Sequence, residues 1–373
     1  MYLLMWGIIT SLVGVWGLWL VPPQPSGEGE QPSTCGPGGS GNRAVDFHKG
    51  ITVVVYWNNE DFKATASNLL DRLAGLGIDN VSLVYPIFQE DWKSVEVYKD
   101  PERTLSKENI RVFVSEAHRR GFKVMLRPLL DESSLTPDGK WRGSIDPADK
   151  AAWFQSYTHL ILGYAALAEE EDVEIFSIGA ELTSLEDETD HWNKLIASVR
   201  RSFSGQITYS SHQNISATAR FWPQLDFIGV DAYPPLNVPV DASVEELVAA
   251  WQPVVSKMRR QCRALGIPLV FTELGTRSQK GSHLQPWVWD HGTEIDLETQ
   301  RRYYAASCQA ASRLVVGIYW WAVFFNSQGD PQRDPGFNPI GKPAELEIAR
   351  CYQELIGSIT QFLQLEVQAP PLW

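Results

Sequence analysis

The sequence predicts a (β/α)8 barrel of the TIM type, an α/β fold in which eight parallel strands alternate with helices. Eight short apolar runs rich in β-branched residues follow one another along the chain, and helical patterns separate most of them. The repeat occupies about 320 residues, which suits a fold of roughly 250 residues that often carries insertions. A doubly wound open sheet is the competing architecture. No G-x-G-x-x-G follows the first run, so its dinucleotide-binding version has no support.

The predicted strands are continuous apolar runs, as expected for strands that are buried on both faces of a parallel sheet. They lie near Ile51–Tyr56, Val81–Tyr85, Lys123–Arg127, Ile175–Gly179, Gln206–Ser210, Phe227–Asp231, Leu269–Thr272 and Gly317–Ala322. The spacing between them leaves room for a helix after most strands. The connection after the fifth strand is the weakest, because Ser216–Trp222 could hold only a short helix.

The predicted helices show apolar residues at helical spacing between polar ends. In Ser106–Gly121, a serine stands at the expected N-cap and a glycine follows the last turn. The others are Leu69–Leu76, Ala151–Ala168, Trp192–Val199, Val244–Leu265, Leu297–Arg313 and Ala344–Leu363. Each stands beside a predicted strand, so together they complete the alternating pattern.

The N-terminus differs from the rest of the chain. Residues 1–21, Met1 to Val21, carry no charged side chain, and this length can span a bilayer. We expect an export segment that is retained as a membrane anchor, with a buried N-terminal helix as the alternative. Residues 22–43 are rich in Pro, Gly, Ser and Gln and read as a flexible linker. Residues 44–373 form the barrel domain, which we expect outside the cell or at its surface.

The composition excludes several classes of function. A net charge of −13 argues against a nucleic-acid partner, because phosphate binding needs clustered Lys and Arg. The 7 His are scattered without an H-E-x-x-H or a Cys/His ligand spacing, so we expect no metal and no cofactor. No G-x-S-x-G nucleophile elbow is present. The 15 Trp exceed what a core of this size needs and suit stacking against sugar rings. We expect a monomer.

The four cysteines form no C-x-x-C pair. Cys35 lies in the predicted linker, whereas Cys262, Cys308 and Cys351 lie in predicted helices. Cys308 and Cys351 could meet between late helices, but sequence spacing cannot establish a bridge. Buried, unpaired thiols are therefore the expected state.

Two glutamates stand where predicted strands end. Glu181 follows the fourth strand, and Glu273 follows the core of the seventh. Active sites of (β/α)8 barrels lie at the carboxyl ends of the strands, so the two carboxylates should share one site. A pair of carboxylates is what glycosidic bond cleavage requires, one as acid and one as nucleophile or base. The pair therefore predicts a sugar hydrolase acting on a polysaccharide or oligosaccharide.

Other predicted strand ends carry charged, polar or aromatic residues that suit the same chemistry. These ends are Tyr56-Trp57-Asn58, Arg127 to Asp131, Ser211-His212-Gln213-Asn214, Asp231-Ala232-Tyr233 and Tyr319-Trp320-Trp321. An arginine and a tyrosine beside a carboxylate would keep it ionised, and aromatic rings would hold a sugar. His212 is either a structural histidine or a hydrogen-bond donor to substrate. Because Trp320 and Trp321 are adjacent, only one of them can point into the barrel.

The motifs at these ends resemble those of glycoside hydrolase family 113, a (β/α)8 group of clan A that includes retaining β-mannanases. The matching segments are Gly139–Gly143, Ile178–Leu182, Asp226–Tyr233, Thr272–Ser278 and Gly341–Ala344. The resemblance covers roughly residue 49 to the last helix, nearly all of the predicted barrel. It implies a retaining β-mannanase that needs no cofactor.

Carried over position by position, the resemblance implies a role for each matching residue. Glu181 would be the acid/base and Glu273 the nucleophile, with Tyr233 bonded to the nucleophile and Arg127 supporting it. Lys280 would reach substrate hydroxyls. Trp320 or Trp321 would form the floor of the subsite at the cleaved bond. The cleft walls would come from the loops Asp131–Asp146 and Ser278–Glu294, with Trp141, Trp287 and Trp289.

Two positions depart from the pattern of the clan. Ala180 stands where an asparagine commonly precedes the acid/base, and Leu129 stands where many relatives carry a polar residue or histidine. Both changes affect the sugar that is accepted more than the hydrolysis itself. Two competing functions remain at this stage. One is a non-catalytic carbohydrate-binding barrel, and the other is a membrane-anchored scaffold protein that would expose an apolar patch.

Overall fold

The computed structural model describes residue 35 and residues 46–290, 292–325 and 329–354. The predicted anchor and nearly all of the predicted linker lie outside these residues. Within the described part of the chain, no helix has both the length and the apolar character that crossing a membrane requires.

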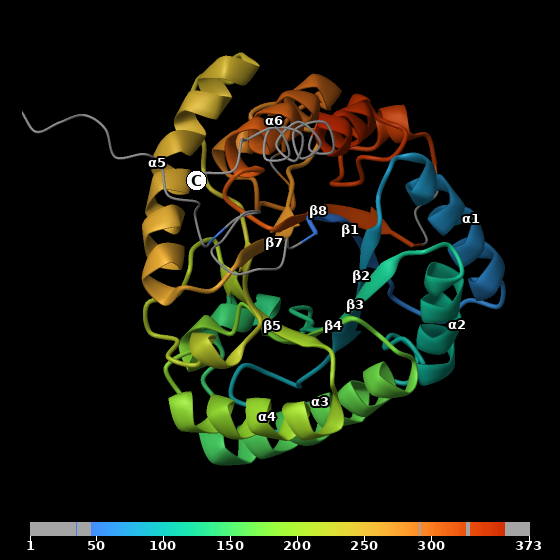
Figure 1. Cartoon of the computed structure of the whole chain (residues 1–373), viewed down its shortest axis with the longest axis vertical. Helices are drawn as coiled ribbons and strands as arrows, with labels where there is room; N and C mark the ends of the chain where they lie inside the picture. Colours follow the sequence, from blue (N-terminus) through green and yellow to red (C-terminus); the bar gives the residue numbers. More distant parts are fainter. Residues whose placement is uncertain (1–34, 36–45, 291, 326–328, 355–373) are drawn as a thin grey trace, which may run out of the picture. The chain divides into compact units, whose positions relative to one another are not determined.

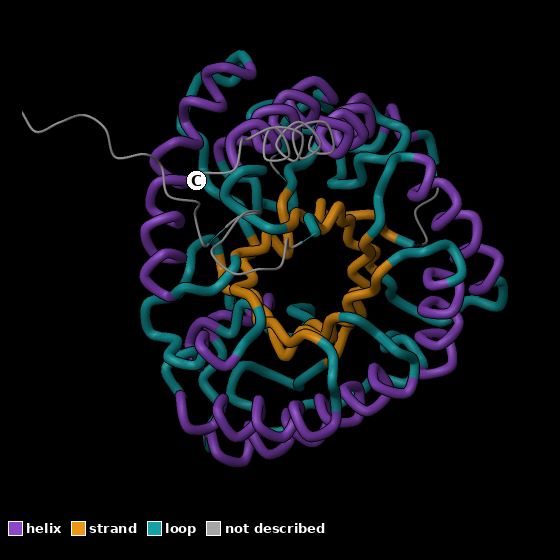
Figure 2. Tube along the Cα trace, viewed as in Figure 1, coloured by secondary structure: helices purple, strands orange, loops and turns teal. Residues whose placement is uncertain are grey.

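Eight parallel strands close into a barrel in chain order, with β8 pairing back onto β1. Figure 2 shows this closed ring of strands surrounded by helices. The strands are β1 (His48–Val54), β2 (Asn80–Ile87), β3 (Lys123–Leu130), β4 (Ile175–Ala180), β5 (Gln206–His212), β6 (Phe227–Asp231), β7 (Leu269–Leu274) and β8 (Gly317–Phe324). All eight predicted strands and the (β/α)8 fold are thereby confirmed. Every residue of β2 is buried, which explains why the predicted strands show no polar alternation.

Helices cover the outside of the barrel, as Figure 1 shows. They are α1 (Phe62–Gly75), α2 (Lys107–His118), α3 (Lys150–Glu170), α4 (Thr189–Ser202), α5 (Val244–Leu265) and α6 (Leu297–Ala311), and residues 343–354 are also helical. The end of the predicted helix Ala344–Leu363 lies outside the described residues. Ser106 caps α2 as predicted, because its side chain accepts a hydrogen bond from the backbone N–H of Asn109.

The connection between β5 and β6 has no α-helix among its residues, all of which the structure describes. It holds only a 3₁₀ turn, η4 (Trp222–Gln224), which begins at the last residue of the predicted segment Ser216–Trp222. Aromatic rings occupy the space that a helix would cover: Phe221 and Trp222 pack on Tyr209 with ring centroids 5.3 and 5.9 Å apart. These large buried rings shield the barrel at this point in place of a helix.

Inside the barrel, apolar side chains form separate layers at its two ends. One cluster joins the first halves of several strands: Met125, Ile175, Phe227, Val270, Val316 and Tyr319. The other lies at the carboxyl ends, and we call it the mouth cluster: Val54, Val84, Leu129, Ala180, Tyr233, Trp321, Ala322 and Phe337. Polar and charged side chains border the mouth cluster, and they form the site described below.

Both cysteine pairs are disulfide-bonded, so the expectation of unpaired thiols was wrong. Cys308 of α6 is bonded to Cys351, and Cys35 is bonded to Cys262 of α5. Their Cα atoms lie 5.7 Å apart in the Cys35–Cys262 pair and 5.9 Å apart in the other, well within the range of disulfides. Cys35 also accepts a backbone hydrogen bond from Leu269, so it is fixed at the start of β7. Residue 35 of the predicted linker is thus part of the folded domain.

The Cys35–Cys262 bond joins residues 227 positions apart, and its removal is expected to destabilise the barrel. The double variant Cys35→Ser/Cys262→Ser should lose about 2–4 kcal/mol of unfolding free energy, because the unfolded chain gains conformational freedom. Denaturant unfolding of the full chain measures this difference. Cys308→Ser/Cys351→Ser, with 43 positions between the partners, is the comparison and should lose less in the chain-entropy account. An unchanged midpoint for the first variant would contradict the prediction.

Candidate active site

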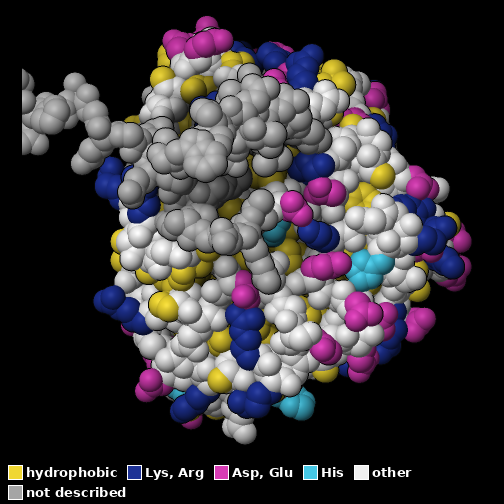
Figure 3. Space-filling view, viewed as in Figure 1, with side chains coloured by type: hydrophobic (Ala, Val, Ile, Leu, Met, Phe, Trp, Pro, Cys, Tyr) yellow, Lys and Arg dark blue, Asp and Glu magenta, His cyan; other side chains and the backbone are white. Residues whose placement is uncertain are grey.

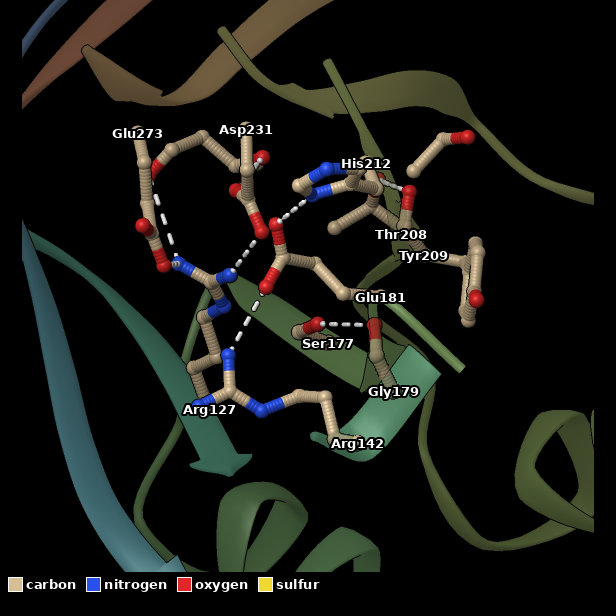
Figure 4. A network of polar contacts seen from close by, with 12 residues as sticks. Arg127, Arg142, Ser177, Gly179, Glu181, Thr208, Tyr209, His212, Asp231 and Glu273 are labelled. Carbon is tan, nitrogen blue, oxygen red and sulfur yellow. Dashed lines mark hydrogen bonds and ion pairs between the residues drawn. The ribbon is translucent and has the colours of Figure 1, made fainter. Parts of the chain in front are cut away.

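Glu181 and Glu273 meet at the carboxyl end of the barrel, together with Asp231. Glu181 follows β4 directly, Asp231 ends β6, and Glu273 is the penultimate residue of β7. The pairing register shifts just before each of them, between Ser177 and Ala180, between Val230 and Asp231 and between Phe271 and Leu274. Such irregularities turn side chains away from the regular alternation of a strand. Figure 4 shows the three carboxyl groups facing two arginines.

The backbone is strained where the site begins. Glu181 has a φ of 54°, in the left-handed region that a residue with a side chain rarely adopts. Trp57, after β1, and Gln213, after β5, have φ values of 69° and 52°. Each such residue costs about 1–3 kcal/mol and persists only where surrounding structure enforces it. Strain at three strand ends of one barrel face is typical of a functional site.

Glu273 is buried and is held by two contacts. The hydroxyl of Tyr233 donates a hydrogen bond of 2.7 Å to Oε2, and Nη1 of Arg127 lies 2.7 Å from Oε1. These are the contacts that the family resemblance implied for Tyr233 and Arg127. Both oxygens of the carboxyl group are thereby fixed in direction, so its orientation does not depend on solvent.

Arg127 serves two carboxylates at once. Its guanidinium is fully buried, and Nη2 donates a hydrogen bond of 2.6 Å to Oδ2 of Asp231. Oδ1 of Asp231 accepts a second bond, 2.8 Å long, from the hydroxyl of Thr272. Asp231 was not among the predicted site residues, although it stands in a quoted motif at the end of a predicted strand. The place of Asp231 at a predicted strand end could have identified it as a site residue.

Both oxygens of Glu181 have a nitrogen atom within hydrogen-bonding distance. Nδ1 of His212 lies 2.5 Å from Oε1, and Nη1 of Arg142 lies 2.8 Å from Oε2. Arg142 is part of the 3₁₀ turn η2 (Arg142–Ser144), and its Nε donates to the carbonyl of Leu130. Sequence reasoning quoted the motif Gly139–Gly143 but missed this arginine as a site residue. His212 contacts Glu181 rather than standing alone.

The network brings three carboxylates against two guanidinium groups. Burial raises the pKa of Glu273 to about 8, the charge of Asp231 adds to the rise, and Arg127 opposes it. Burial likewise raises the pKa of Asp231 to about 6, against the charge of Arg127. Burial works against ionisation of Glu181 too, but the hydrogen bond from His212 and the charge of Arg142 lower its pKa. Because the three carboxyl groups interact strongly, a proton bound in the network is shared among them and does not belong to one residue alone.

The two adjacent tryptophans of β8 point in opposite directions. Trp321 belongs to the mouth cluster beside Tyr233, whereas Trp320 is fully buried and stacks on Tyr304 of α6 at 4.5 Å. Trp321 is therefore the candidate floor of the site, and Trp320 is excluded as a site residue. Pleat alternation required that one of them face the helices, but only the structure shows which.

The remaining predicted site residues lie on loops around the mouth. The ring of Trp141 lies 4.6 Å from that of His212, so Trp141 borders the network. Trp57 and Trp287 are 53% and 37% exposed, and both leave apolar ring surface open to solvent. Lys280 lies on the loop after β7, as expected, and its exposed ammonium forms a 2.6 Å ion pair with the exposed Glu294. Its contact with substrate hydroxyls stays a prediction.

Figure 3 shows acidic, basic and histidine side chains gathered around a hollow near the centre of the face in view. Ala180 and Leu129, the two departures from the clan pattern, both pack in the mouth cluster, so the wall they form is apolar. Among the described residues, no group of three or more His, Cys, Asp and Glu side chains is arranged to hold a metal ion. The arrangement can hold one carboxylate ionised and fixed while a second carboxyl group exchanges a proton.

A family model and two solved structures relate this chain to the same family. The model of Glycoside Hydrolase Family 113 matches residues 53–342. A GH113 β-mannanase from Alicyclobacillus acidocaldarius, solved in complex with ManMIm, is 27% identical with a TM-score of 0.74, covering 83% of this chain and 98% of that chain. A GH113 β-1,4-mannanase is 26% identical with the same TM-score of 0.74, covering 83% and 99%.

A more distant structure shares the fold alone. The family 5 mannosidase from Rhizomucor miehei is 10% identical, with a TM-score of 0.55 over 84% of this chain and 94% of that chain. No curated protein matches this chain.

Proposed function

The chain belongs to glycoside hydrolase family 113, and from this premise we propose that it is a retaining β-glycoside hydrolase that cleaves β-1,4-linked mannan or manno-oligosaccharides. The observation that carries the proposal is the pair Glu181 and Glu273, each held by its own arginine at the carboxyl end of the barrel. The two solved β-mannanases of the family support the choice of mannan.

Glu273 is the proposed nucleophile. An oxygen of its carboxylate attacks the anomeric carbon, and the bond between that carbon and the leaving oxygen breaks. Tyr233 and Arg127 fix the direction of the carboxylate, because each contacts one of its oxygens at 2.7 Å. Water later replaces the ester oxygen of Glu273 at the same carbon, so the sugar keeps its β configuration.

Glu181 is the proposed acid/base. It gives a proton to the leaving oxygen in the first step and takes a proton from the attacking water in the second. The strained backbone at Glu181 supports this role, since strain is retained where a side chain must be aimed at a reacting group. A non-catalytic carbohydrate-binding barrel would have no need of either carboxylate.

Trp321 is the proposed floor of the subsite at the cleaved bond, since its ring borders the mouth cluster beside Tyr233. Ala180 cannot bind a sugar hydroxyl in the way that asparagine does. We therefore assign recognition of the sugar to Arg142, whose guanidinium reaches Glu181, the neighbour of Ala180. Trp57, Trp141 and Trp287 are proposed to contact sugars on either side of this subsite.

Activity of the full chain, purified with its disulfides intact, tests this function. Mannohexaose should be hydrolysed in preference to other β-linked hexaoses, and Glu181→Ala should lower the turnover number by about 10²-fold or more. Glu96→Ala, which removes an exposed glutamate outside the network, is the matched control and should leave turnover unchanged. Equal turnover by all three proteins would remove Glu181 from the mechanism, and preference for another β-linked sugar would overturn the choice of mannan.

The pH dependence of kcat/KM should be bell-shaped. The acidic limb should reflect Glu273, because only its ionised form attacks the anomeric carbon and burial raises its pKa to about 8. Activity should therefore rise as the pH rises through this value and fall again where Glu181 loses the proton that it delivers. Asp231→Asn removes a negative charge that raises the pKa of Glu273, so it should move the acidic limb to lower pH by about one unit. An acidic limb that stays in place or moves to higher pH would contradict this expectation.

The protein is also proposed to act outside the cell, anchored through residues 1–21 and as a monomer. Two disulfide bonds support export, because such bonds persist in oxidising compartments. Fractionation of cells tests the proposal. The full chain should stay in the membrane fraction after an alkaline carbonate wash and should be cleaved by protease added to intact cells. Recovery in the soluble cytoplasmic fraction would contradict it.

A further inference from the structure

His212 ends β5, and its ring faces Glu181 directly. Nδ1 lies 2.5 Å from Oε1 of Glu181, and the imidazole packs at a tilt of 54° against Trp141, with ring centroids 4.6 Å apart. The side chain is 29% exposed, so it is bounded by protein but not closed off. One ring nitrogen is therefore committed to the carboxyl group that the proposed mechanism uses as its acid.

Both oxygens of that carboxyl group lie against nitrogen atoms. Oε1 faces Nδ1 of His212, and Oε2 accepts a hydrogen bond from Arg142. Arg142 cannot give up a proton, because guanidinium groups stay protonated at any working pH. Imidazole can, because its ordinary pKa lies close to neutrality. Of the two partners of Glu181, only His212 can therefore supply the proton that an acid must deliver.

We propose that His212 stores the proton that Glu181 passes to the leaving oxygen and takes it back in the second half of the reaction. This inference rests on the proposed function. His212 is a positioning and proton-storing residue, and Glu181 remains the group that acts on the substrate.

The proton count balances over the cycle. In the first half, the Nδ1 proton moves to Glu181 and on to the leaving oxygen, while the carboxylate of Glu273 forms a bond to the anomeric carbon. His212 is left as neutral imidazole and the leaving sugar as an alcohol. In the second half, water forms a bond to the same carbon and the ester bond to Glu273 breaks. The water proton passes to Glu181 and returns to His212.

The charged groups that face His212 suit this role. Burial is the largest single effect on the ring and lowers its pKa, and Arg142 from the loop after β3 acts in the same direction. The hydrogen bond to Glu181, together with the charges of Glu181 after β4 and Asp231 on β6, outweighs both, so the pKa of His212 is raised. The site thus favours a protonated His212 ring, from which the Nδ1 proton can pass to the carboxylate of Glu181.

Hydrogen bonds fix the end of β5, which carries His212. Glu186 is a buried carboxyl group that accepts hydrogen bonds from the hydroxyls of Tyr209 and Ser211 at 2.9 and 3.5 Å. Ser211 in turn accepts from the backbone N–H of Ser216, which fixes the loop beyond. Gln213, in left-handed conformation, donates its N–H to the carbonyl of Asp231. These contacts fix the backbone on both sides of His212.

The test compares a substrate that needs an acid with one that does not. His212→Gln can still donate a hydrogen bond to Glu181 but cannot carry the proton. On mannohexaose its kcat/KM should fall by about 10²-fold. On a 2,4-dinitrophenyl β-mannoside, whose leaving group needs no protonation, kcat/KM should change less than about threefold. An equal loss on both substrates, or no loss on either, would overturn the inference.

Glu181→Gln separates failure of this inference from failure of the proposed function. If Glu181 is the acid, this variant loses activity on mannohexaose far more than on the dinitrophenyl substrate, whatever His212 does. Loss of that contrast in Glu181→Gln would refute the function itself. A contrast in Glu181→Gln without one in His212→Gln would refute only the role of His212.

A second measurement does not depend on activity or on the stability of the histidine variant. ¹⁵N NMR of the full chain with labelled histidine follows the protonation of His212 with pH. The pKa of His212 should fall in Glu181→Gln, because the hydrogen bond to a carboxylate and its charge are lost. Glu96→Ala should leave the pKa of His212 unchanged. An unchanged titration in Glu181→Gln would show that the pair does not share a proton.

Discussion

Replacing Glu273 by alanine is expected to abolish hydrolysis, with a fall in kcat of about 10⁴-fold or more. Without the carboxylate, no protein oxygen forms the bond to the anomeric carbon. The fold should survive, because Arg127 keeps its hydrogen bond to Asp231 and loses only one of two carboxylates that compete for it. Steady-state hydrolysis of mannohexaose and thermal unfolding of the same preparation measure the two effects.

Azide provides the control for the role of Glu273. In Glu273→Ala, azide can enter the space of the lost side chain and attack the anomeric carbon of a dinitrophenyl β-mannoside, giving the α-mannosyl azide. In Glu181→Ala, azide should instead attack the glycosyl ester and give the β-mannosyl azide. Turnover of Glu273→Ala within about tenfold of the parent would be incompatible with nucleophilic catalysis by this residue.

Replacing Arg127 by methionine is expected to cause the largest loss of stability of any single change in the site. Its guanidinium is fully buried and lies 2.6 Å from Asp231 and 2.7 Å from Glu273, so removal leaves two buried carboxylates without their counter-charge. Breaking a buried ion pair in this way costs about 3–5 kcal/mol. Hydrolysis should be lost as well, because the charge of Arg127 opposes the rise in the pKa of Glu273, and without it the ionised nucleophile becomes scarcer still. Denaturant unfolding and the kcat/KM of the soluble protein test both effects.

Two further variants show whether charge is the cause. Arg127→Met/Asp231→Asn also removes one of the two buried carboxylates that lack a counter-charge. This double variant should recover part of the lost stability but no activity. Arg72→Met, at a half-exposed arginine paired with Glu345, should change the unfolding free energy by less than about 1 kcal/mol. If Arg127→Met were as stable as Arg72→Met, the buried ion pairs would not contribute to the unfolding free energy as proposed.

The barrel could be predicted from the sequence because its signal is local. Strands buried on both faces produce continuous apolar runs, and all eight appear at the expected places. Glu181 and Glu273 could be predicted for the same reason: parallel strands of a barrel end on one face, so residues at the ends must meet. Tyr233 and Arg127 also stand at predicted strand ends, and their contacts with Glu273 were implied by the family resemblance.

The partners of these residues could not be predicted, because they depend on how loops fold back over the barrel. Arg142 lies in a 3₁₀ turn 12 residues after Leu130, and nothing in its immediate sequence distinguishes it from a solvated arginine. The ion pair of Lys280 with Glu294 likewise depends on how the loop after β7 folds. The cysteine pairs join distant segments and carry no local spacing. Which of Trp320 and Trp321 faces inward depends on strand register.

The most direct test of the central claim is to trap the covalent intermediate on the nucleophile. The full chain would be treated with a 2-deoxy-2-fluoro-β-mannosyl fluoride, digested, and its peptides analysed by mass spectrometry. The account predicts one fluoromannosyl adduct, on Glu273, and none in Glu273→Ala. An adduct on Glu181 or Asp231, or hydrolysis that proceeds through an α-configured first product without any adduct, would contradict it.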